Sequence, residues 1–215
     1  MKRLLLLAAL LCALPSFAAD DFSPAERAIF MSNQLGNVKP PATLRYRYVK
    51  AGTLEPGFDD TVQVALKARP DKTCCAAAAE FLTGERRLAL PEVEAAEGNP
   101  VVLYFLERDI REMQRLTKGQ ANYFRKRIRM AIYQGATIRD VQVTVGGRSV
   151  AAREITITPY TDDPNAAKFT QYLGKRYVFT LSDAVPGGVV SIATRVDGAT
   201  LGTPALWTED MSYVP

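Results

Sequence analysis

The chain has 215 residues, of which 27 are lysine or arginine, 23 are aspartate or glutamate and none is histidine. The absence of histidine removes the commonest general base and the commonest metal ligand, and it excludes Ser-His-Asp and Cys-His catalytic arrangements. The chain also contains no phosphate-binding P-loop, no dinucleotide-binding fingerprint and no Ser-x-x-Lys motif. We therefore expect neither a cofactor nor a metal site.

The first residues have the pattern of a secretory signal peptide. Lys2 and Arg3 precede an apolar run over residues 4–14, and Ser16 and Ala18 place small side chains three and one before a cleavage site. The run is too short to span a bilayer, which takes about 18 to 20 residues. We predict a signal peptide over residues 1–18 and a periplasmic or secreted protein of the bacterial envelope.

Residues 19–215 are expected to fold as a single globular domain. Removing the leader takes away Lys2 and Arg3 and leaves the charges nearly balanced, so we expect no nucleic-acid partner. No later apolar run is long enough for a membrane helix, and we predict no transmembrane segment in the mature chain. Cys12 follows Leu11, where lipid attachment requires a small residue, which argues against a lipoprotein.

A helix is predicted to open at Ser23. Ser23 can cap it, Pro24 suits the first turn and Glu26 completes a capping box, while Gly36 is placed to end it. Alternating apolar residues then predict strands over residues 44–48 and 62–66 as an antiparallel pair.

Residues 71–98 are ambiguous. The alanine-rich run favours helix, whereas the pattern over residues 81–90 is typical of a hairpin, and we predict strands here. Next, Asn99 and Pro100 are a cap and a first-turn proline for a helix that extends to about Thr117. A second helix is predicted over residues 121–134, and the short break at Gly119 makes the two an antiparallel hairpin.

After Gly135, apolar residues again recur at every second position, as in β-strands. The predicted strands are 141–145, 155–157, 177–181 and 190–196, with Gly146-Gly147 as a two-residue hairpin turn. Both ends of the chain are expected to be loosely tied. The sum predicts an α+β fold, an antiparallel β-sheet of six or more strands with an N-terminal helix and a central helical hairpin packed on one face.

Cys74 and Cys75 are adjacent, in a compartment that would oxidise thiols. A disulfide between neighbours, intermolecular bonds and two buried or reduced thiols are all open alternatives. The chain has no C-x-x-C spacing, so a redox role has little support.

Asp109 is the candidate catalytic residue, because its helical angle places a carboxylate inside the apolar face of its helix. A carboxylate facing inward must be paired or protonated. Either it is a perturbed acid in a cleft, or it forms a structural ion pair with Arg125 or Arg127 of the second helix, and the ion pair is favoured.

The second helix also carries cations and large amphipathic side chains away from its apolar side. These candidates for ligand or partner binding are Tyr123, Lys126, Arg127, Arg129, Met130 and Tyr133. A solvated helix face with no binding role is the alternative. The pairs Asp59-Asp60 and Asp162-Asp163 could act as paired carboxylates or calcium ligands, but turn chemistry explains them better.

The leading hypothesis is a non-enzymatic envelope protein that binds an apolar or amphipathic ligand, or a partner protein, between a curved sheet and its covering helices. A lipid, a lipoprotein or an envelope protein is the expected partner. In layout the chain resembles the half-barrel carriers that ferry lipoproteins across the periplasm, a resemblance of architecture that transfers no residue roles. The alternatives are a carboxylate-dependent hydrolase using Asp109 with Glu107 or Glu112, and an assembly factor that docks through the basic helix.

Overall fold

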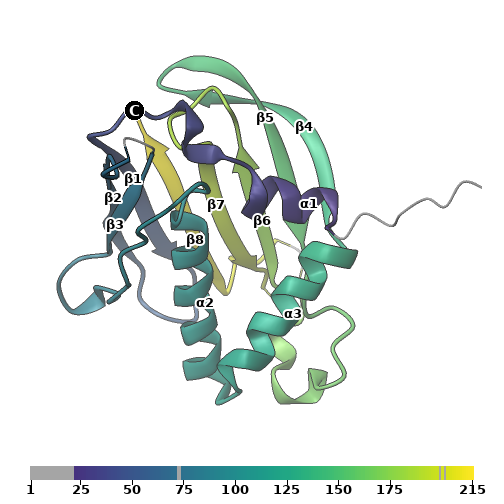
Figure 1. Ribbon diagram of the computed structural model, residues 1–215. Helices are drawn as coiled ribbons and strands as arrows, with labels where there is room; N and C mark the ends of the chain where they lie inside the picture. The colour runs from purple at the N-terminus through teal and green to yellow at the C-terminus, as the bar shows by residue number, and fades with distance from the viewer. Residues whose placement is uncertain (1–21, 72–73, 199, 201) are drawn as a thin grey trace, which may run out of the picture.

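The computed structural model describes residues 22–71, 74–198, 200 and 202–215. They form an antiparallel sheet with helices packed on one of its faces (Figure 1). This confirms the predicted α+β class, including the N-terminal helix and the central helical hairpin. The predicted signal peptide and Cys12 lie outside the described residues.

The sheet has eight strands. They are β1 (Ala42–Ala51), β2 (Phe58–Lys67), β3 (Ala76–Phe81), β4 (Thr137–Val145), β5 (Arg148–Ile157), β6 (Arg176–Leu181), β7 (Val189–Val196) and β8 (Trp207–Val214). Their order across the sheet is β3-β2-β1-β8-β7-β6-β5-β4. The predicted antiparallel pair near the N-terminus is confirmed, with Tyr46 of β1 opposite Val62 of β2.

The N-terminal helix starts as predicted but ends earlier. α1 (Pro24–Glu26) has the Ser23 capping box, and it continues as a π-helical turn over Arg27–Met31. Gly36 does not end this helix. The backbone is already extended at Ser32, and a separate 3-10 turn follows over Gln34–Asn37.

The two long helices agree closely with the sequence prediction. α2 (Val101–Thr117) begins where the Asn99 side chain accepts a hydrogen bond from the Val101 N–H, 3.2 Å away. It ends at Lys118, whose φ of 59° is left-handed. α3 (Ala121–Gln134) follows after the break at Gly119.

The glycine turn and the alanine-rich strand are also observed. Gly146 and Gly147 join β4 to β5 with φ values of 55° and 78°, as a two-residue hairpin of this kind requires. The alanine-rich run forms β3, but the segment that returns after it makes only two isolated bridges, Phe81 with Leu88 and Ala77 with Val93. The expected hairpin is therefore incomplete.

The expectation of a loosely tied C-terminus is wrong. β8 lies inside the sheet, between β1 and β7. Its inward-facing positions include Trp207, Glu209 and Met211, all buried. The charged residue at the middle inward position interrupts the apolar alternation, and the strand was not predicted for this reason.

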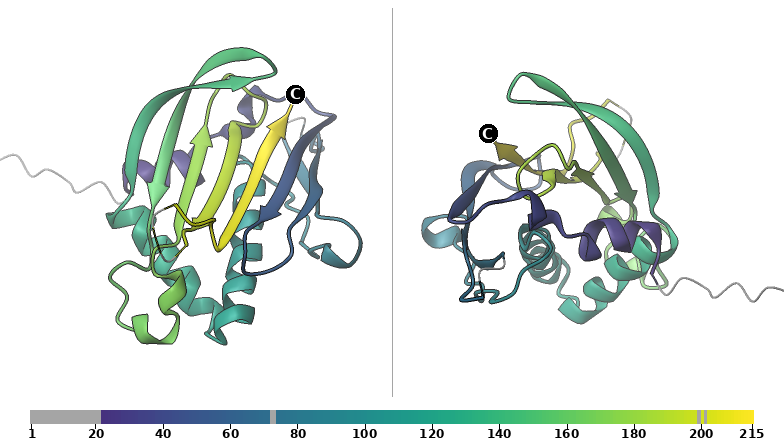
Figure 2. Two further views of the ribbon diagram at one scale, coloured as in Figure 1. Left: turned by 180° about the vertical axis from the view of Figure 1, so that it is seen from behind. Right: turned by 45° about the horizontal axis from the view of Figure 1, so that its top comes forward.

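The sheet curves around the helices, and none of the helices in the described residues lies on its other face (Figure 2). Large buried side chains fill the layer between sheet and helices, among them Tyr46, Tyr48, Phe105 and Phe179. The expected ligand space between sheet and helices is therefore occupied by core. In the described part of the chain, no helix has both the length and the hydrophobicity needed to cross a membrane.

Candidate functional site

An apolar groove of about 780 Å³ lies among the helices, on the flank of α2 that is turned away from the sheet. Its walls are the N-terminal residues 22–31, the segment 90–100, and the facing sides of α2 and α3. Apolar side chains in its lining include Ile29, Phe30, Met31, Leu103, Ile110 and Ile132. This volume is typical of a cavity for a small organic ligand.

The spacing of residues on α2 explains why one helix serves both the core and the groove. Leu103, Leu106 and Ile110 recur at helical spacing and line the groove. Phe105 and Asp109 lie further round the helix, and both are buried. The apolar residues of α2 therefore form one wide arc, and Leu103 at the edge of this arc is left exposed.

Exposed apolar side chains gather at the groove. Of the eight large apolar or aromatic side chains that are exposed in the described residues, four line it: Phe22, Phe30, Met31 and Leu103. Leu103 is the most exposed of them, at 57%. Scattered exposed apolar residues need no explanation, but a cluster of them marks a binding surface.

Charged residues stand among this apolar lining. Arg125 of α3 pairs with Glu107 of α2 at 2.8 Å, which joins the two helices across the groove. Arg129, one turn further along α3, also lines the groove and is exposed. Within the described residues Arg129 has no ion pair or hydrogen bond.

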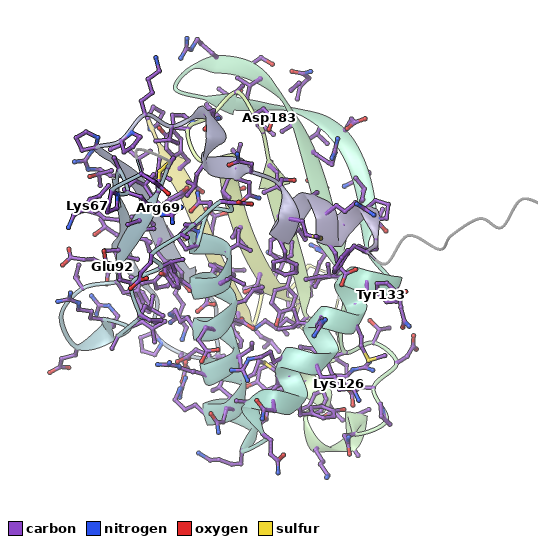
Figure 3. All side chains as sticks on the ribbon, in the orientation of Figure 1. Lys67, Arg69, Glu92, Lys126, Tyr133 and Asp183 are labelled. Atoms are coloured by element: carbon purple, nitrogen blue, oxygen red, sulfur yellow. A yellow bond between two sulfur atoms is a disulfide. The ribbon has the colours of Figure 1, made fainter. Side chains whose placement is uncertain are left out.

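The six binding candidates on α3 separate into three groups. Tyr123 and Arg127 face the loop that follows β5: Tyr123 donates to Asp163, and Arg127 pairs with Asp163 at 2.9 Å and donates to the Pro159 carbonyl at 3.1 Å. Arg129 faces the groove. The remaining candidates, Lys126, Met130 and Tyr133, are exposed outside it, and Figure 3 shows Lys126 and Tyr133 on the outer side of α3.

Asp109 is fully buried, as its helical angle predicted, but its expected partners are wrong. It pairs with Lys175 and accepts a hydrogen bond from Tyr177 Oη at 2.6 Å. Arg125 and Arg127 pair instead with Glu107 and Asp163. The partners of Asp109 precede or begin β6, so the ion pair ties α2 to the sheet rather than to α3.

A wider buried polar cluster surrounds this pair. Glu209 of β8 pairs with Arg108 of α2, whose guanidinium lies 5.1 Å from the centre of the Tyr48 ring. Burial raises the pKa of Glu209; Arg108 opposes this effect and the nearby Asp109 adds to it. Neither Asp109 nor Glu209 lines the groove or the second hollow described below.

The other two carboxylates considered for hydrolysis are held by cations. Glu107 pairs with Arg111 at 3.1 Å in addition to Arg125. Glu112 pairs with Arg115 at 2.8 Å and with Lys50 at 3.6 Å. These ion pairs hold both carboxylates at the surface of α2.

The aspartate pairs have mainly structural contacts. Asp59 and Asp60 lie on β2 rather than in a turn, which corrects the sequence interpretation. Asp60 accepts hydrogen bonds from Thr61 N–H and Thr83 Oγ1, both at 2.8 Å, and pairs with Arg86 at 2.9 Å. It thereby fixes the loop after β3 to β2.

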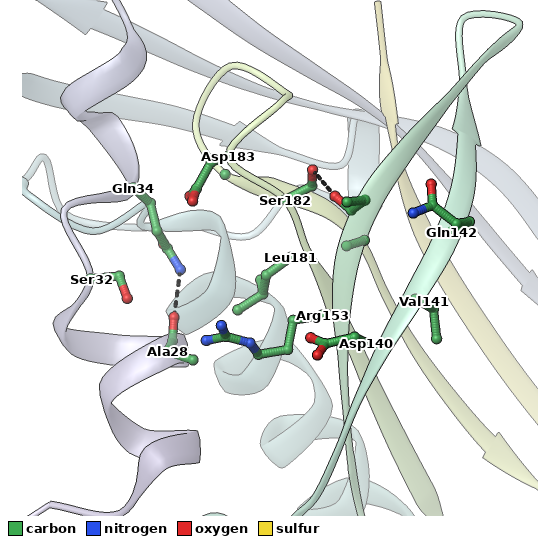
Figure 4. Close-up of a pocket in the computed structure, with 13 residues that line it drawn as sticks. Ala28, Ser32, Gln34, Asp140, Val141, Gln142, Arg153, Leu181, Ser182 and Asp183 are labelled. Carbon is green, nitrogen blue, oxygen red and sulfur yellow. Dashed lines mark hydrogen bonds between the residues drawn. The ribbon is translucent and has the colours of Figure 1, made fainter.

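A second, polar hollow of about 450 Å³ lies between the N-terminal helical segment and the β4–β5 hairpin (Figure 4). Arg153 of β5 reaches across it toward Ala28, and Asp140 and Asp183 are also in its lining. Arg153 forms no ion pair within the described residues. The mixture of charges and the scarcity of large apolar side chains distinguish this hollow from the groove.

Cys74 and Cys75 form a disulfide between adjacent residues, one of the alternatives that the sequence left open. Cys75 is buried, and its backbone pairs with that of Ala96. Among residues 22–71, 74–198, 200 and 202–215, no three or more His, Cys, Asp or Glu side chains are grouped so that they could hold a metal ion.

The groove, Lys175 and Glu209 were not found by sequence reasoning. The groove arises from the way separate segments pack, and Lys175 lies between predicted elements. Glu209 did have a signal, because it shares the two-residue period of Trp207 and Met211.

No protein-family model matches this chain, and no curated protein is similar to it in sequence. Among solved structures, the chain is similar to the crystal structure of the Mycobacterium tuberculosis lipoprotein LppX. The two share 9% sequence identity with a TM-score of 0.35, over 89% of this chain and 94% of that one. A likeness at this level assigns neither a family nor a function.

Proposed function

We propose that this protein is an exported binding protein that accepts the apolar chain of an amphipathic molecule in the groove beside α2. The observation that supports this function is the gathering of exposed apolar side chains around one hollow of about 780 Å³.

The leader pattern over residues 1–18 supports export. The mass of the purified protein tests export, because cleavage after Ala18 predicts a chain that begins at residue 19.

The energetics of association favour a long chain as the ligand. Burial of one CH₂ group contributes about 0.8 kcal/mol. Loss of translational and rotational freedom on binding costs on the order of 4–15 kcal/mol. A ligand held mainly by the apolar lining must therefore bury on the order of ten or more methylene groups, as a lipid acyl chain does.

The groove supports ligand binding better than the buried cluster supports hydrolysis. Asp109 is enclosed by core and has both carboxylate oxygens engaged. A substrate would have to displace Lys175 or Tyr177 to reach it. The groove, in contrast, is open among the described residues, and four of its apolar side chains are exposed there.

The proposal can be tested by titrating the protein with a pyrene-labelled long-chain alcohol, which is uncharged. Leu103→Asp places a charge in the groove and is expected to weaken binding about tenfold or more, because a buried leucine contributes about 1.5–3 kcal/mol. Met130→Asp is the matched control, since Met130 is also an exposed apolar residue on a helix but lies outside the groove. Equal binding by the Leu103→Asp variant and the unchanged protein would overturn the proposal.

A further inference from the structure

The wall of the groove formed by α3 is basic. α3 contains Arg125, Lys126, Arg127 and Arg129 and has no acidic residue. Two of these cations are neutralised by carboxylates of other elements, Arg125 by Glu107 and Arg127 by Asp163. Lys126 and Arg129 remain without an ion pair in the described part of the chain, and of these two only Arg129 lines the groove.

Arg129 stands beside an apolar floor. This floor includes Ile128, next to Arg129 in the chain, and Ile132, one turn further along the same side of α3. Arg125 lies one turn before Arg129 in the same wall. Ile128 and Ile132 are buried, whereas Arg129 is exposed. A ligand chain that covers the isoleucines would bring its polar end within reach of the guanidinium.

The carboxylates of the groove leave Arg129 uncompensated. Glu26 accepts the Ser23 N–H as part of the capping box, at 2.9 Å, and Glu107 is held by arginines. Glu97 stands on another wall, in the segment 90–100, and makes no ion pair with Arg129. An anionic group at the α3 wall would therefore supply the charge that Arg129 lacks.

From this arrangement we infer that the groove selects amphiphiles with an anionic headgroup, a carboxylate or a phosphate, and that Arg129 binds this headgroup. The inference rests on the proposed function, because the apolar lining must first hold the chain. Arg129 is well suited to both headgroups, since its guanidinium can donate two parallel hydrogen bonds to paired oxygens.

The test compares three pyrene-labelled probes of one chain length: the alcohol, the carboxylic acid and the phosphate monoester of the alcohol. The unchanged protein is expected to bind at least one anionic probe about 3- to 10-fold more tightly than the alcohol, a modest ratio because Arg129 is exposed. Arg129→Gln should remove this preference, so that the variant binds the anionic probe no more tightly than it binds the alcohol. Lys126→Gln is the matched control and should keep the preference, because Lys126 lies outside the groove.

The outcomes separate the two proposals. If all three probes fail to bind, the proposed function fails and the inference fails with it. If the three bind equally, or if Lys126→Gln removes the preference as fully as Arg129→Gln does, the groove still binds chains but Arg129 does not select the headgroup. A preference for the phosphate probe alone, or for the acid alone, supports the inference and identifies the headgroup.

Discussion

Lys175 and Asp109 form an ion pair in which neither side chain has any exposed area. The Lys175 ammonium also lies 3.6 Å from the centre of the Trp207 ring, and Tyr177 donates to the second oxygen of Asp109. Three elements, α2, β6 and β8, thus meet at one buried charge pair. We attribute a structural role to Asp109 on the basis of these contacts.

We predict that Asp109→Leu lowers the free energy of unfolding by about 3–5 kcal/mol, because it leaves Lys175 buried without a counter-charge. Lys175→Met should cost a similar amount. The double variant should lose less than either single variant, since apolar residues of similar volume can replace a buried pair. Urea unfolding followed by the fluorescence of Trp207, the single tryptophan, measures all three. Strictly additive losses would contradict the pairing.

Asp60 gives a prediction about acid stability. Burial alone would raise the pKa of Asp60, but hydrogen bonds from Thr61, Arg86 and Thr83 outweigh it and hold this pKa below its usual value. A lowered pKa in the folded state means that the ionised carboxylate stabilises the fold above the unfolded pKa of about 3.9, and that this contribution is lost as the pH falls further.

Asp60→Asn is therefore expected to destabilise the protein by about 1–3 kcal/mol near neutral pH, and the difference from the unchanged protein should shrink as the pH falls below about 4. Asp59→Asn is the control. Asp59 pairs with Arg47, and both side chains are more than half exposed, so its loss should change stability by less than about 1 kcal/mol. Urea midpoints measured between about pH 7 and pH 3 decide the matter. A constant difference for Asp60→Asn would refute the assignment.

Two arginines of α3 are expected to differ in their effect on stability. Arg127→Ala removes the ion pair to Asp163, whose side chain is fully buried, and should lower stability by about 1–3 kcal/mol. Arg129→Ala removes no hydrogen bond or ion pair among the described residues and should stay within about 0.5 kcal/mol of the unchanged protein. Thermal unfolding distinguishes the two. Similar melting temperatures for both variants would show that Arg127 is not a structural residue.

Local signals in the sequence predicted the helices well. These signals are Ser23 with Glu26, Asn99 with Pro100, and the break at Gly119. Each involves residues only a few positions apart, so each can be recognised from the sequence alone. The Gly146-Gly147 turn was predicted for the same reason.

Features that depend on distant partners were not predicted. The segment of β8 was missed because its inward position 209 is a glutamate, and burying that charge makes sense only beside Arg108, a residue 101 positions away. Asp109 was placed inward correctly, yet its partner Lys175 is 66 positions away, beyond α3, β4 and β5. The groove was misplaced because the layer between sheet and helices is filled by buried side chains such as Tyr48 and Phe105, and the open space lies beside α2 instead.

Photo-crosslinking with a long-chain fatty acid that carries a diazirine on its chain tests the location of binding most directly. After irradiation and proteolysis, the labelled peptides are mapped by mass spectrometry, with an excess of unlabelled fatty acid as the competitor. Binding in the groove predicts competed label on peptides that contain residues 22–31 and 101–110, which line it from two sides. Label that falls instead on the outer face of the sheet, or label that the competitor does not reduce, would contradict the account.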